Sequence, residues 1–244
     1  MHVRNLVLLL TVFTSAWSHA QVGLPSYDFS KMHEIYEKVF KLSRGTYRSD
    51  CSLSHHTTQE MQSFFQKGLN KIVNVNKWDS LVGIPGQSFQ LYKVSGTQSH
   101  QGARKGDYIE IKLPADPTNR SYWVRVESFY FTNLSPYEMA FSMVLKPTSD
   151  PARKKSSRVI TDHFFTNAAT NTLNLKLYNN TLQASVVGDH EEPNFVQAPS
   201  WAEGFANKAI VRMSWGLNLP EVGQIGFQRL VWHKLTKSIV DCQE

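Results

Sequence analysis

The feature that most constrains the fold is a change in the spacing of apolar residues near residue 87. Before this point apolar side chains recur every three or four residues, which is the period of an amphipathic helix. After it they alternate with polar residues: Leu173, Leu175 and Leu177 are separated by Asn174 and Lys176. Alternation predicts strands with one buried face. It favours an antiparallel sheet, because parallel strands buried on both faces are apolar throughout.

Two helices are predicted before the strands. The first follows Ser30, a suitable N-cap, and ends before Gly45. The second covers residues 58–71, where an apolar stripe is formed by Met61, Phe64, Phe65, Leu69 and Ile72. Stripes of this kind usually face a core, so neither helix is assigned a ligand.

About nine strands are predicted in the second part of the chain. Alternation places them around residues 89–94, 109–113, 122–131, 139–145, 158–165, 173–177, 182–186, 209–219 and 226–235. Asn179-Asn180 predicts a tight hairpin turn, because Asn tolerates positive φ.

These elements indicate an α+β fold dominated by β structure. We expect the N-terminal helices to pack on an antiparallel β-barrel or two-layer β-sandwich, because a twisted sheet of nine strands tends to close or split. Residues 21–244 form one globular domain in this interpretation, helical over 28–75 and antiparallel β over 87–235.

The first twenty residues have the pattern of a cleaved signal peptide. Arg4 precedes an apolar stretch over residues 6–16, and Ser18-His19-Ala20 places small residues at a peptidase site. The alternative is an N-terminal anchor, but about 20 apolar residues are needed to span a bilayer. We therefore expect cleavage after Ala20, a secreted or periplasmic location, and no integral membrane segment.

The chain has two cysteines, Cys51 and Cys242. In an oxidising compartment an even pair predicts a disulfide bond, here between the helical region and the last residues of the chain. A catalytic thiol is the weaker alternative.

The formal net charge is +6. Part of this excess is concentrated in a stretch with Arg153, Lys154, Lys155 and Arg158, which either contacts an anionic surface or is simply a solvated loop. No basic helical face or aromatic RNA-binding motif accompanies it, so no nucleic-acid partner is expected.

No catalytic, metal-binding or cofactor-binding motif is present: the chain lacks both Gly-x-Ser-x-Gly and His-Glu-x-x-His. Asp162 and His163 would point to opposite faces of a strand, which argues against a shared site. Paired carboxylates for glycoside cleavage leave no sequence signature, so a hydrolase whose site forms only in three dimensions stays an alternative.

Aromatic residues provide the candidate ligand-binding site. We predict that Trp123, Tyr130, Trp201 and Trp215 contact an apolar, amphipathic or glycan ligand, since large rings offer contact area at little entropic cost. The alternative is that they belong to the core, most of all Trp215, which is in phase with Val211 and Met213.

The sequence thus favours an exported, non-enzymatic binding protein for such a ligand or for a protein partner. The alternatives are the hydrolase and a structural envelope protein. Three triplets, at Asn119, Asn133 and Asn179, match the N-glycosylation pattern, which matters only in a eukaryotic secretory pathway.

Overall fold

The computed structural model describes residues 46–113, 120–153, 160–191, 194, 197–200, 203–204 and 224–241. Its helices are α3 (Thr58–Val73), the 3₁₀ turn η1 (Val75–Lys77), α4 (Trp78–Val82) and α6 (Gln224–Ile239). Its strands are β1 (Thr46–Ser52), β2 (Ser88–Tyr92), β3 (Tyr108–Lys112), β4 (Ser121–Ser135), β5 (Glu138–Pro147), β6 (Thr170–Tyr178) and β7 (Thr181–Asp189). The predicted leader and the predicted helix that begins after Ser30 lie outside the described residues.

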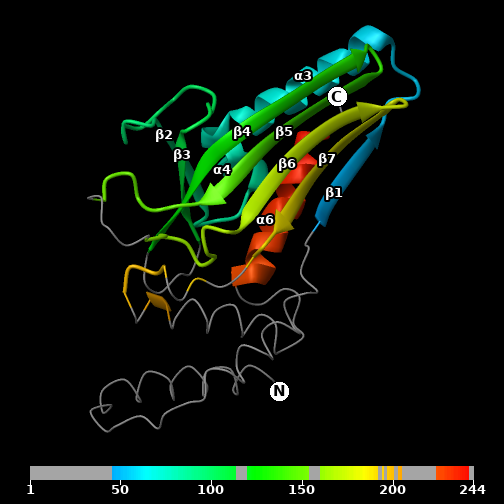
Figure 1. Cartoon of the computed structure of the whole chain (residues 1–244). Coiled ribbons are helices and arrows are strands. Elements are labelled where there is room, and N and C mark those ends of the chain that lie inside the picture. The colour runs from blue at the N-terminus through cyan, green and yellow to red at the C-terminus, as the bar shows by residue number, and fades with distance from the viewer. Residues whose placement is uncertain are drawn as a thin grey trace, which may run out of the picture. The chain divides into compact units, whose positions relative to one another are not determined.

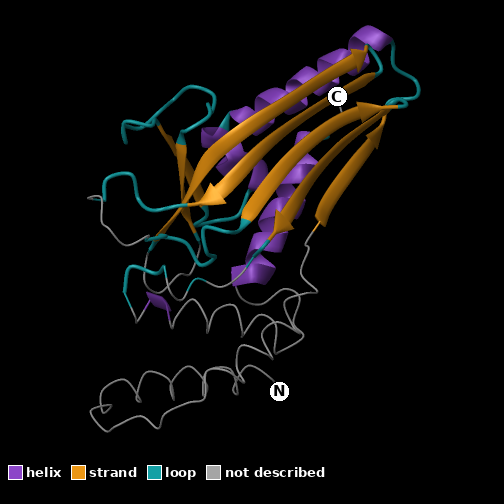
Figure 2. Cartoon of the chain, viewed as in Figure 1, coloured by secondary structure: helices purple, strands orange, loops and turns teal. Residues whose placement is uncertain are grey.

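The seven strands form one antiparallel sheet in the order β1-β7-β6-β5-β4-β3-β2. Consecutive strands are neighbours from β2 to β7, and β1 joins the sheet beside β7, with Thr46 opposite Val187. The sheet curls around the helices, which cover its inner face (Figures 1 and 2). The β-dominated, antiparallel architecture is confirmed, whereas nine strands and a second sheet are not.

Alternation sets the two faces of the sheet as predicted. Every second residue of β5, β6 and β7 is buried. The buried side chains of these strands that form the core are Met139, Phe141, Met143, Leu145, Leu173, Leu175, Leu177, Leu182, Ala184 and Val186. The intervening residues are mostly polar and form the outer face, so one face of this sheet is buried and the other is exposed to solvent.

Helix α3 confirms the helix predicted over 58–71. Thr57 and Glu60 form a capping box, in which each side chain bonds the backbone N–H of the other residue. The buried stripe of α3 faces β6, and the lack of a side chain at Gly68 permits this approach: a Cβ there would lie 3.1 Å from Leu175 Cδ2.

Residues 226–235, predicted as a strand, instead belong to helix α6. Val231, Leu235 and Ile239 are buried at a spacing of four residues, which is the helical period. Ser49 Oγ on β1 and Thr236 Oγ1 on α6 are 3.0 Å apart, which places this helix against the edge strand of the sheet. The adjacent apolar residues Leu230, Val231 and Trp232 had obscured the helical period.

Two further predictions are corrected. Residues 46–52, placed within the helical region, form β1, whose polar sequence gives little strand signal. Residues 160–165, within the strand predicted over 158–165, form no regular strand. The strand predicted over 209–219 lies outside the described residues.

The β6–β7 turn confirms the hairpin predicted at Asn179-Asn180. The two residues have φ values of 47° and 58°, the left-handed conformation that a two-residue hairpin loop requires. Among the described residues, no helix is long and apolar enough to cross a membrane.

Cys51 lies on β1, and Cys242 lies outside the described residues. Cys51 shares a face of β1 with Ser49, whose hydroxyl contacts Thr236 on α6. Because β1 and α6 run in the same direction (Figure 1), Cys51 is at the end of the sheet toward which α6 leads. The Cys51–Cys242 disulfide stays a prediction.

Candidate functional site

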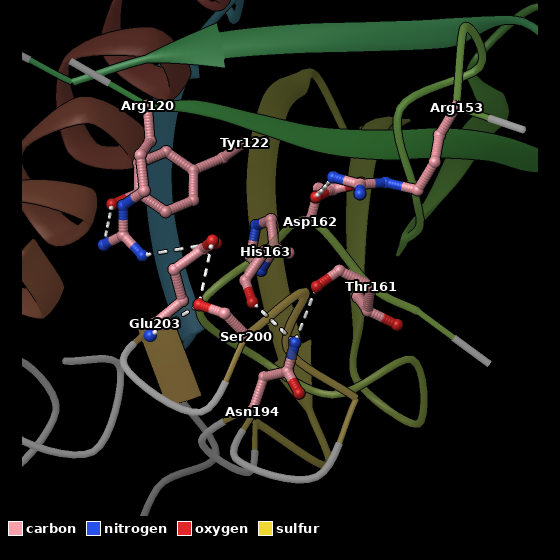
Figure 3. A network of polar contacts seen from close by, with 9 residues as sticks. All are labelled: Arg120, Tyr122, Arg153, Thr161, Asp162, His163, Asn194, Ser200 and Glu203. Atoms are coloured by element: carbon pink, nitrogen blue, oxygen red, sulfur yellow. Dashed lines mark hydrogen bonds and ion pairs between the residues drawn. The ribbon is translucent and has the colours of Figure 1, made fainter. Parts of the chain in front are cut away.

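A polar pocket of about 290 Å³ lies where β4 begins. Its walls come from three separate parts of the chain: residues 120–123, then Asp150 and Arg153 with residues 161–163, and finally Pro199 with Glu203. Figure 3 shows the side chains that surround it, with the imidazole of His163 between two arginine–carboxylate pairs. No periodic pattern in the sequence links these segments, so the sequence did not predict this site.

Arg153 and Asp162 form the first of these pairs. The Arg153 Nε atom donates to Asp162 Oδ2 over 3.0 Å, and Nη2 donates to Oδ1 over 2.5 Å. The backbone N–H of Asp150 also donates to Asp162 Oδ2. The hydrogen bond to Asp162 raises the pKa of Arg153 above its usual value. Arg153, one of the residues for which either an anionic surface or a solvated loop was expected, has its charge engaged by a carboxylate.

Arg120 forms the second pair, on the other side of His163. Its Nη2 donates to the hydroxyl of Tyr122 over 3.0 Å, and its Nη1 lies 4.0 Å from Glu203 Oε2. A turn positions Glu203, because the Ser200 hydroxyl contacts both the backbone N–H and the carboxylate of this residue. The guanidinium of Arg120 also lies 5.4 Å from the centre of the Tyr122 ring.

His163 is a buried, neutral imidazole between these pairs. Its Nδ1 accepts a hydrogen bond from the backbone N–H of Phe165, so Nε2 carries the proton. Burial lowers the pKa of His163 from 6.5 to about 3. Phe164 stacks on the imidazole with a centroid distance of 4.3 Å. Asp162 and His163 both line the pocket, which corrects the expectation that they point to opposite faces, because their segment is not a strand.

Asn194 holds the loop that carries His163. Its side-chain amide donates to the carbonyl oxygens of Thr161 and His163, over 2.7 and 3.0 Å, and its own backbone N–H donates to Phe164 O. Gln197 holds the same loop with a further hydrogen bond, which its amide oxygen accepts from the hydroxyl of Thr161. The loop is thus fixed by buried hydrogen bonds before any ligand arrives.

Only one of the four predicted ligand-binding residues can be placed in the pocket. Trp123 lines it, but the residue is only 6% exposed, and its ring packs on Tyr92 with 5.1 Å between the ring centroids. Trp123 therefore contributes mainly to the packing around the pocket. Tyr130 is near the other end of β4, on the exposed outer face. Trp201 and Trp215 lie outside the described residues, as do Lys154, Lys155 and Arg158.

The pocket does not have the donor set of a metal centre. In the part of the chain that the structure describes, no group of three or more His, Cys, Asp or Glu side chains is arranged to hold a metal ion. Asp162 and Glu203 each face an arginine instead.

No protein-family model and no curated protein matches this chain. Among solved structures it is similar to protein Ms6760 from Mycobacterium smegmatis, with 13% identity and a TM-score of 0.33 over 82% of this chain and 91% of that chain. Ara h 8.0201 gives 12% identity and a TM-score of 0.29 over 79% of this chain and 99% of that chain. Norcoclaurine synthase from Thalictrum flavum, in complex with dopamine and hydroxybenzaldehyde, gives 8% identity and a TM-score of 0.31 over 83% of this chain and 90% of that chain. Similarity at this level assigns no ligand to the pocket.

Proposed function

We propose that this protein is an exported, non-enzymatic binding protein whose polar pocket takes one sugar unit of a glycan. The proposal rests on the lining of the pocket, where planar charged groups stand beside the aromatic rings of Tyr122 and Trp123. Vicinal hydroxyl groups of a sugar both donate and accept hydrogen bonds, so they match carboxylates and guanidinium groups that are fixed side by side. Export rests on the N-terminal leader.

The size of the pocket favours a single ring. A volume of about 290 Å³ corresponds to about ten water molecules at about 30 Å³ each. This is room for a hexose and its water contacts, and it is small for a lipid chain. The lining is also too rich in charged groups to suit a wholly apolar ligand.

The charge balance favours a neutral ligand. Two arginines line the pocket with three carboxylates, those of Asp150, Asp162 and Glu203. A phosphate or sulfate would need guanidinium groups released from these carboxylates, at the cost of separating ion pairs. A neutral polyhydroxyl ligand adds hydrogen bonds while the pairs stay intact.

The rival function is glycoside hydrolysis, since carboxylates stand on both sides of the pocket. Such an enzyme needs one carboxyl group that delivers a proton to the leaving oxygen. Asp162 accepts two hydrogen bonds from Arg153, and Glu203 faces Arg120, so both are arranged as acceptors. This geometry supports binding without turnover.

The test is a glycan microarray probed with the purified protein, followed by calorimetric titration of the strongest glycan. Glu203→Gln keeps the shape of the side chain and removes its charge, so we expect about tenfold weaker binding from the loss of charge-assisted hydrogen bonds. Glu127→Gln is the matched control, because Glu127 is also paired with an arginine, is equally exposed at 37%, and does not line the pocket.

Equal affinity of Glu203→Gln and Glu127→Gln would contradict the assignment of the pocket. An array with no glycan bound would contradict the ligand class. Release of a shortened glycan during the titration would favour the hydrolase instead.

A further inference from the structure

Exposed apolar side chains gather at the end of the sheet opposite the pocket. Five of the seven large hydrophobic residues exposed among the described residues belong to the β4–β5 and β6–β7 hairpins; we call these five, Tyr130, Phe131, Leu134, Tyr137 and Tyr178, the hairpin-tip cluster. Leu134 protrudes most, with 70% of its surface exposed. A solvent-exposed apolar patch of this kind usually marks a contact site, because exposing clustered apolar area to water costs free energy.

A basic hollow adjoins this cluster on the outer face. It has a volume of about 330 Å³, and its lining includes Arg48, Lys176 and Tyr178 but no carboxylate. Lys176 Nζ lies 4.5 Å from the centre of the Tyr178 ring and has no carboxylate partner among the described residues. Arg48 Nε donates to Asp50 Oδ1 over 2.7 Å, and the Gln183 amide oxygen accepts from Arg48 Nε and Nη2 over 3.0 and 2.8 Å.

Strand register places Tyr130, Tyr178 and the hollow on the outer face, whereas Phe131 is opposite Phe141 and packs near Phe65 of α3 on the inner face. Tyr130 is opposite Ser142 on β5, and the row continues through Asn174 and Ser185 to Arg48 on β1. Side chains in such a row project from the same side of a sheet. Both hairpin turns lie at the same end of the sheet (Figure 1), so rings and cations there can meet one flat partner together.

We propose that this end of the sheet docks on a lipid bilayer that contains anionic phospholipid. Leu134 and the ring of Tyr130 enter the interface between headgroups and acyl chains, where amphipathic aromatic side chains are favoured. Tyr137 stays at the edge of this contact, because its hydroxyl accepts a hydrogen bond from Thr58 of α3. The hollow beside Tyr178 takes a lipid phosphate, whose charge complements Lys176; Arg48 lines the same hollow but is paired with Asp50. Glu138 and Asp50 lie on the same face and oppose this attraction, which keeps docking reversible.

This docking leaves the polar pocket accessible. The pocket lies at the start of β4, and the hairpin-tip cluster lies at its end. A protein held on a bilayer by the hairpins would therefore present the pocket away from the lipid surface. The proposal stands apart from the glycan proposal, because vesicles without sugar headgroups test it.

The test is co-flotation of the full chain with phosphatidylcholine vesicles, prepared with and without phosphatidylserine. We expect recovery with the anionic vesicles and a loss of about tenfold or more in partition for Leu134→Glu. Lys176→Gln should weaken partition into anionic vesicles and leave the phosphatidylcholine baseline unchanged. Val94→Glu is the matched control, because Val94 is 64% exposed and lies outside the cluster.

The apolar N-terminal segment is common to all these variants, so its contribution cancels in the comparison. Equal partition of Leu134→Glu and Val94→Glu would overturn the proposal, and so would wild-type protein that stays with the unbound fraction. An N-linked glycan on Asn133 of the native protein would also overturn it, because that residue precedes Leu134 and a bulky sugar there would keep the hairpin from the bilayer.

Discussion

The buried imidazole of His163 couples the stability of the pocket to pH. Its pKa is about 3 in the folded protein, because burial disfavours the charged form, and about 6.5 in an unfolded chain. Above pH 6.5 the imidazole is neutral in both states and contributes no pH dependence. Between these two pKa values the unfolded chain binds a proton that the folded protein does not, so the free energy of unfolding falls by about 1.4 kcal/mol per pH unit on acidification.

We expect His163→Asn to flatten this dependence. The amide oxygen of Asn takes the place of Nδ1 as acceptor for the Phe165 N–H, and it does not titrate. The measurement is the free energy of unfolding by urea between pH 6.5 and pH 4, compared as a slope because the smaller side chain also lowers stability at neutral pH. His100→Asn, at an exposed position, is the control. Identical slopes for the wild type and His163→Asn would show that this histidine is not the coupled group.

At the scale of elements, the capping box is the device that fixes where α3 begins. The Thr57 hydroxyl accepts from the Glu60 N–H over 3.3 Å, and Glu60 Oε2 accepts from the Thr57 N–H over 2.7 Å. Together these bonds satisfy two backbone donors near the start of the helix. The hydrogen bond that the Glu60 carboxylate accepts from the Thr57 N–H lowers the pKa of Glu60 below its usual value, and a second bond from the Thr57 hydroxyl to the same carboxylate adds to this shift.

Thr57→Ala should lower the free energy of unfolding by about 1 kcal/mol, the usual cost of losing an N-cap. Thr57→Ser should restore most of it, because serine keeps the hydroxyl. Chemical denaturation at pH 7 measures both variants. A loss of stability in Thr57→Ser as large as in Thr57→Ala would point to packing of the threonine methyl group rather than to capping.

Some of these elements could be predicted from the sequence, and others could not. Strands β5 to β7 were predictable because apolar and polar residues alternate strictly along each of them, as a strand with one buried face requires. Helix α6 was not, because Leu230, Val231 and Trp232 are adjacent and hide the four-residue spacing. The pocket had no signature at all: Arg120, Asp162 and Glu203 meet only through the fold, since their separation in the chain leaves no period to detect.

At the scale of the whole molecule, the predicted Cys51–Cys242 disulfide would link the edge strand to the end of the chain. It would enclose about 190 residues, and loss of such a bond typically costs about 2–5 kcal/mol. We expect the double variant Cys51→Ser/Cys242→Ser to melt at a lower temperature than the oxidised wild type and at the same temperature as the reduced wild type. Peptide mapping under non-reducing conditions should recover one cross-linked peptide. Two free thiols in freshly isolated protein would contradict the pairing.

The place of β1 beside β7 has a consequence for how the chain folds. Strands β2 to β7 pair with their neighbours along the chain, and the longest connection between them has 22 residues, from β5 to β6. Strand β1 must instead find a partner more than a hundred residues away, as Thr46 does with Val187. Closing so long a loop costs entropy before its contacts repay it, and it slows the search. We therefore expect the meander to nucleate first and β1 to dock late. Substitutions in β1 should accelerate unfolding while leaving the folding rate nearly unchanged.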